Sequence, residues 1–160
     1  MKEKSKLLGI SHHLWYEFSM FLFITKELIK GYPPGVHNNA LLEAFALHIR
    51  NLIDFLYYND NPKNDDVYAG DFFDNINDWR NKRPTITELL KESKKRANKE
   101  VSHLTYKRID ITPEEKKWHY VKIYKDMLKS FEMFVEIVDK QLLGPDWDDF
   151  LQHPERYKIV

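Results

Sequence analysis

Cysteine is absent from this chain of 160 residues, which excludes disulfides, thiolate catalysis and cysteine-ligated zinc. A secretory leader is not expected either, because the start MKEKSKLLGI lacks a long apolar core. The most apolar run, from Leu14 to Ile24, is too short to cross a bilayer and contains Glu17. These absences predict a soluble, cytoplasmic protein with no membrane segment.

An excess of either charge is also lacking, since Lys plus Arg and Asp plus Glu each number 25. No general positive field therefore attracts polyanions, and any contact with nucleic acid must come from a local patch. Glycine is scarce, with five residues, and strand patterns are nearly absent, whereas 42% of the residues are hydrophobic. We expect an all-α, single-domain helical bundle of about five helices over residues 1–160, with an N-terminal extension at 1–10 and a C-terminal tail at 146–160.

Apolar periodicity and stop signals predict the first two helices. One should run from Ser11 or His12 to Lys30, where Gly31 provides a C-terminal stop. The next, from Ala40 to Tyr58, is apolar nearly all round, so we expect it at the centre of the bundle.

The second half of the chain carries two capping-box patterns. Residues 59–78 are rich in turn formers and predict a loop with a short helix at Asp66–Phe73. Thr85 with Glu88 predicts the start of a helix that ends near Arg108. Thr112 with Glu115 predicts the start of the longest helix, Pro113–Leu142. Its apolar seam suits an intramolecular core or a dimer interface, and consists of Val121, Tyr124, Leu128, Phe131, Val135, Val138 and Leu142.

The segment RANKEVSHLTYKR, residues 96–108, contains the most site-like pattern. Arg96 and His103 are seven residues apart, so on a helix they point nearly the same way, about 10 Å apart along the axis. A permanent cation beside a group that titrates near neutrality suits binding and cleavage of a phosphodiester. The same pair also suits an ordinary solvated helix edge, and a lone histidine there is often structural.

A polar stripe interrupts the apolar surface of the predicted central helix. On a helical wheel Arg50 and Asp54 each fall within about 20° of Glu43, with Asn51 beside them. One interpretation is an Arg50–Asp54 ion pair at a solvated groove or an interface. The other is that the stripe faces Arg96 or Arg108 across a groove that holds His103, whose charge the carboxylates would tune.

Basic residues gather on the same predicted helix. Lys95 and Lys99 are candidate phosphate ligands, together with their neighbours Lys91 and Lys94. A run of charges like this is also typical of a solvated helix face.

The run NKEVSHLTYKR resembles the helix motif of HEPN domains, small all-α proteins with a metal-independent ribonuclease site at a dimer interface. Their motif has an arginine with a polar residue next to it and then a histidine, with four to six intervening residues in all. The abortive-infection type carries an Asn/Asp-Lys pair shortly before the histidine, and here Asn98 and Lys99 precede His103. Ala97, not an arginine, stands before Asn98, and Arg96 is displaced by one position.

The resemblance implies attack of an RNA 2′-hydroxyl on the adjacent phosphate. His103 would act as general base or acid, and Arg96 or Arg108 would stabilise the phosphoryl charge. It also implies a homodimer, no cofactor, and RNA together with an antitoxin or another protein as partners, in a toxin-antitoxin or phage-defence setting.

Metal binding is the competing chemistry. Glu100 and His103 have the Glu-x-x-His spacing of helical di-iron proteins, which need two such motifs, whereas this sequence supplies one. Glu115 with His119, and the set His12, His13 and His48, have no spacing that requires a metal. We therefore expect no metal site. The function stays open between a HEPN-like ribonuclease or its non-catalytic RNA-binding relative and a non-enzymatic helical interaction module.

Overall fold

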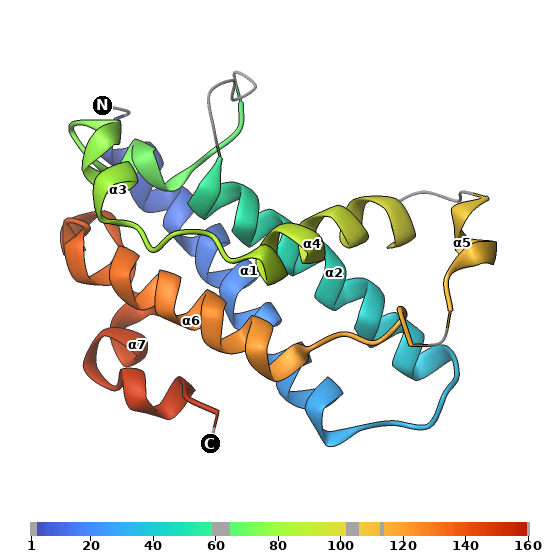
Figure 1. Ribbon diagram of the computed structural model, residues 1–160. Coiled ribbons are helices and arrows are strands. Elements are labelled where there is room, and N and C mark those ends of the chain that lie inside the picture. Colours follow the sequence, from blue (N-terminus) through green and yellow to red (C-terminus); the bar gives the residue numbers. More distant parts are fainter. Residues whose placement is uncertain (1–2, 59–64, 102–105, 113, 160) are drawn as a thin grey trace.

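Three long helices form the body of the protein. The computed structural model describes residues 3–58, 65–101, 106–112 and 114–159. In it α1 (Lys4–Lys30) packs against α2 (Val36–Tyr57) and α6 (Tyr120–Ile137), and the shorter α4 (Glu88–Arg96) lies over α2 (Figure 1). The described residues form no strand. The all-α class is thus confirmed.

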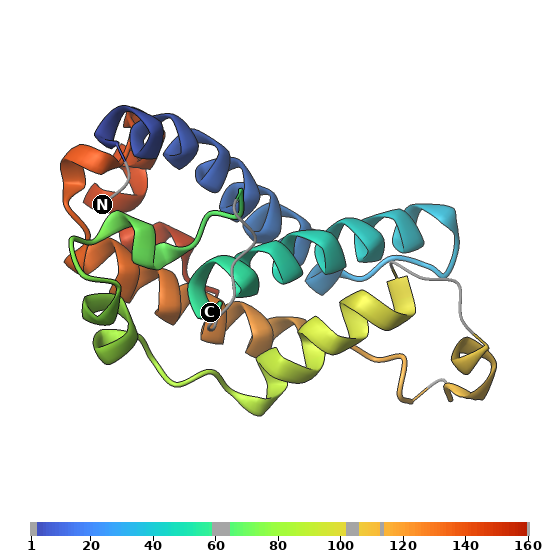
Figure 2. The same cartoon turned by 90° about the horizontal axis from the view of Figure 1, so that it is seen from above.

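Short helices and turns complete the fold. They are α3 (Ile76–Lys82), α5 (Lys107–Asp110), α7 (Asp148–Gln152), a π-helical turn at Ala97–Val101 and 3₁₀ turns at Ala69–Phe72, Lys140–Leu142, Pro145–Trp147 and Pro154–Tyr157. Figure 2 shows the first turns of α1 beside the segment that follows α6. In both views α5 stands at one end of the molecule, away from the long helices.

Aromatic side chains fill the core. Phe18 of α1 stacks on Phe131 of α6 with 4.2 Å between ring centroids, and Trp147 of the C-terminal tail stacks on Phe18 at 5.9 Å. The tail therefore docks on the bundle. The seam predicted on α6 and beyond is buried except at Val121, which confirms the core interpretation of that pattern over a dimer interface.

The first two helices differ from the prediction mainly at their starts. α1 ends at Lys30 as predicted, and Gly31 follows with φ 79°, a backbone conformation that glycine adopts without strain. It begins at Lys4 rather than Ser11 or His12, and residues 4–10 are helix, not an extension, because Leu7 is buried in the core. α2 also begins early, at Val36, and shares the centre of the bundle with α1.

Tertiary contacts override the predicted elements between α2 and α6. A 3₁₀ turn, Ala69–Phe72, replaces the expected helix at Asp66–Phe73, and α3 was not predicted. The buried Trp79 holds α3 in place by donating from Nε1 to the carbonyl of Leu56 at 2.7 Å. A helix of seven residues depends on such packing, since its own hydrogen bonds are too few.

Thr87, not Thr85, caps α4. The Thr87 hydroxyl accepts from the Leu90 N–H at 3.3 Å and donates to Asp126 of α6 at 2.7 Å. The bond to Asp126 favours Thr87 as the cap, because it fixes the start of α4 against α6. The helix ends at Arg96 rather than near Arg108, and continues as the π-helical turn.

The capping box of Thr112 and Glu115 forms without starting a long helix. Thr112 N–H donates to Glu115 Oε2 at 2.8 Å, and Glu115 N–H donates to Thr112 Oγ1 at 3.3 Å. This pair closes only a turn. The long helix that follows it, α6, begins at Tyr120 and ends at Ile137. The predicted helix Pro113–Leu142 is therefore wrong, and α1 is the longest helix in the described part of the chain.

Candidate functional site

The predicted site residues lie where α4 ends. Arg96 is the last residue of α4, and Asn98 and Lys99 belong to the π-helical turn that follows. π-Helical turns are rare and often occur at functional sites. His103 lies outside the described residues, and the structure describes only the backbone of Arg108, in α5.

Arg96 links the end of α4 to the segment before α6. Its Nη1 donates to the carbonyl of Lys117 at 2.9 Å, and its guanidinium carbon lies 4.2 Å from the centroid of the Trp118 ring. The second distance is typical of a cation–π contact. Burial raises the pKa of Tyr120, and the positive charge of Arg96 opposes that rise. Arg96 is therefore largely engaged by the protein itself.

The same contacts hold the segment just before α6. Arg96 donates to the Lys117 carbonyl there. Trp118 is only 8% exposed and meets Phe45 of α2 edge-on, with 5.4 Å between ring centroids. The segment is held by side chains rather than by a helical ladder.

The polar stripe predicted on α2 is divided between two neighbours. Asp54 pairs with Lys94 of α4, and its Oδ2 lies 4.0 Å from Arg50 Nε. Asn51 instead faces α1, where its Nδ2 donates to Glu17 Oε2 at 3.1 Å. Arg50 and Asp54 thus lie as the ion-pair interpretation predicted, and Asn51 faces away from them. The other interpretation, a groove that holds His103, stays a prediction.

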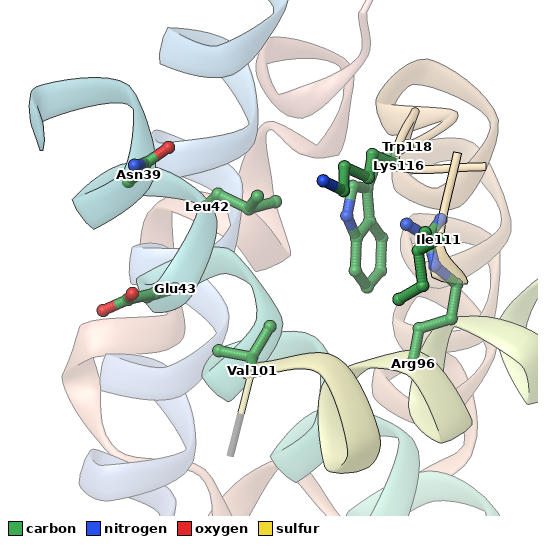
Figure 3. A pocket seen from close by; sticks show the side chains of 8 residues that line it. All are labelled: Asn39, Leu42, Glu43, Arg96, Val101, Ile111, Lys116 and Trp118. Atoms are coloured by element: carbon green, nitrogen blue, oxygen red, sulfur yellow. The ribbon is translucent and has the colours of Figure 1, made fainter. Parts of the chain in front are cut away.

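A pocket of about 250 Å³ brings Arg96 and Glu43 together. Asn39, Leu42 and Glu43 border it from α2, and Arg96, Val101, Ile111, Lys116 and Trp118 border it from the opposite side (Figure 3). Its wall is apolar, and its rim carries both charges. In Figure 3 the Glu43 carboxylate points away from Trp118. The pocket can therefore hold an apolar or flat group whose anionic part meets Arg96 and Lys116.

The lysines on α4 are paired with carboxylates. Lys91 lies 2.6 Å from Glu88, and Lys95, a predicted phosphate ligand, lies 3.4 Å from Glu92. Lys99 is exposed on the π-helical turn. Exposed pairs of this kind contribute only about 0–1 kcal/mol and rearrange readily, so the face has the pattern of a solvated helix surface.

Sequence reasoning missed a buried pair between α1 and α2. His48 is 4% exposed, and its Nδ1 lies 2.7 Å from Glu17 Oε2. Burial alone would raise the pKa of Glu17, but hydrogen bonds from His48 and Asn51 outweigh it and lower that pKa. The available signal was Glu17 itself, a lone carboxylate in an apolar run.

Within the described residues, no group of three or more His, Asp or Glu side chains is placed to hold a metal ion. None of the helices in that part of the chain combines the length and apolarity that a bilayer span requires. Comparisons with protein-family models, curated proteins and solved structures find no match.

Proposed function

We propose that this protein binds single-stranded RNA in the pocket between α2 and the 96–118 segment. The observation that carries the proposal is the pairing of two cations, Arg96 and Lys116, with an apolar wall that includes Trp118. Aromatic and apolar surfaces beside cations are how proteins recognise unstacked bases and the adjoining phosphates. A cavity of about 150 Å³ accommodates benzene, so the volume here is sufficient for a base.

The two cations have different roles in this proposal. Arg96 donates to Lys117 and covers Trp118, so it shapes the pocket wall. Lys116 is exposed at the rim and meets the phosphate. Because Arg96 already donates from Nη1 to Lys117 and has its planar face on Trp118, the proposal is the RNA-binding relative of the HEPN-like ribonucleases rather than the ribonuclease.

Binding and cleavage can be tested separately, because cleavage would depend on His103. Val101, two residues earlier in the sequence, lines the pocket. If RNA is cleaved there, the HEPN resemblance gives His103 the role of general acid or base, with no metal required.

The test is binding of fluorescently labelled single-stranded RNA, followed by anisotropy in EDTA at several salt concentrations. Lys116→Ala should weaken binding several-fold and reduce the salt slope by about one. Lys129→Ala, an exposed lysine of α6 away from the pocket, is the matched control and should bind like the parent protein. Equal effects of the two substitutions, or no binding at micromolar protein in low salt, would contradict the proposal. Gel analysis of the same samples, with His103→Ala alongside, measures cleavage.

A non-enzymatic interaction module is the second candidate function. Tyr106 and Ile109 belong to the 96–118 segment but do not line the pocket, and they are 92% and 81% exposed. Large apolar side chains at such exposure favour a protein partner that covers them. A purified complex that contains a second protein but no RNA, and that Ile109→Asp dissociates, would favour this function.

A further inference from the structure

A second pocket, which shares no residue with the first, lies between α1, α2 and the segment around residues 67–72. Its volume is about 160 Å³. Leu14, Leu52 and Phe72 contribute to its apolar walls, and its polar lining residues are Glu17, Asn51 and His13. A charged group in a small apolar pocket needs a partner of opposite charge, because isolated charge is costly to desolvate.

Glu17 is fixed in position by its neighbours. Both hydrogen bonds that it accepts from described residues, from His48 and Asn51, end on Oε2. Oε1 is therefore the oxygen left for a ligand. The same two bonds lower the pKa of Glu17 against the effect of burial, so the carboxylate is ionised at neutral pH.

The geometry points to a binding site for a small primary ammonium ligand with one ring-sized apolar group. The ammonium would donate to Glu17 Oε1, and the apolar group would fill the space among Leu14, Leu52 and Phe72. The volume sets the size of that group, since an apolar cavity of about 150 Å³ holds one benzene molecule. The charge of Glu17 sets the class, because a carboxylate repels anions, and a neutral isostere can donate at most a hydrogen bond without the attraction between opposite charges.

Benzylamine is a suitable probe, with benzyl alcohol as the neutral isostere and benzoate as the anionic one. Binding to the full chain can be followed by amide chemical shifts in ¹⁵N-labelled protein at pH 7. We expect saturable binding of benzylammonium, binding of benzyl alcohol at least about tenfold weaker, and no shift with benzoate.

Two variants test the two halves of the site. Glu17→Gln should weaken binding of benzylammonium by about tenfold or more and change binding of benzyl alcohol far less, whereas Glu88→Gln, at an exposed glutamate of α4 that lines neither pocket, should change neither. Because Glu17→Gln also removes the partner of His48, the test needs a second variant that leaves this pair intact. Val67→Phe fills the pocket from its half-buried loop position and should abolish binding of both probes.

Three results would overturn the site. They are equal affinity for benzylammonium and benzyl alcohol, undiminished binding to Val67→Phe, and no binding of benzylammonium at millimolar concentration. Each would show that the Glu17 carboxylate and the apolar space do not act together.

Discussion

Arg96→Ala should destabilise the protein by about 2–3 kcal/mol, because Arg96 joins the end of α4 to the segment before α6. The substitution removes a charge-assisted hydrogen bond to the Lys117 carbonyl, which contributes about 1.5 kcal/mol or more. It also removes the cation–π contact with Trp118, which contributes about 0.5–1 kcal/mol at a partly exposed site. For a chain of this length the sum corresponds to a fall in Tm of about 4–12 °C.

Urea unfolding followed by circular dichroism at 222 nm measures the effect. Lys95→Ala is the matched control, since Lys95 is the preceding residue and pairs only weakly, at 3.4 Å, with Glu92. Its cost should stay within about 0.5 kcal/mol. In a Trp118→Leu background, the cost of Arg96→Ala should fall by about 0.5–1 kcal/mol, because the ring contact is already lost. A cost below about 0.5 kcal/mol for Arg96→Ala would refute the structural role, and would make Arg96 available to a ligand.

Local signals predicted helix ends well where no distant side chain competes. Gly31 ends α1 as expected, because its positive φ is a property of the residue itself. The capping box at Thr112 shows the limit of such signals. Its hydrogen bonds form, yet the long helix does not follow, and the backbone before α6 is instead tied to Arg96 at the Lys117 carbonyl. A partner 21 residues away in sequence leaves no trace in local periodicity.

The candidate site was predictable only in part. Helical spacing predicted the approach of Arg50 to Asp54 one turn on, but not the second partner of Asp54, Lys94 of α4. It could not assign Asn51, because a residue about 100° from Arg50 on the wheel faces whichever neighbour the fold supplies, and here that is α1. The buried pair of Glu17 and His48 spans 31 residues, and only the packing of α1 against α2 brings it together. The groove predicted around His103 stays a prediction.

Three further predictions concern burial, assembly and pH. Ser11→Ala should cost about 1–3 kcal/mol in urea unfolding, because the fully buried Ser11 hydroxyl accepts from the Gly144 N–H at 2.9 Å and its loss leaves that donor unpaired; Ser19→Ala, on the exposed side of α1, should cost little. We also expect a homodimer, because Tyr16 and Phe23, seven residues apart on α1, are 53% and 61% exposed, and light scattering that shows a monomer at high micromolar concentration would contradict it. Finally, Glu17 should make stability fall in acid. Its pKa is lowered in the folded protein from the ordinary 4.5, so its contribution is complete above about pH 4.5 and is lost as the pH falls through the lowered value. Glu17→Gln should therefore flatten the stability profile below pH 4.5, and an unchanged acid slope would show that the bonds from His48 and Asn51 do not favour the ionised carboxylate.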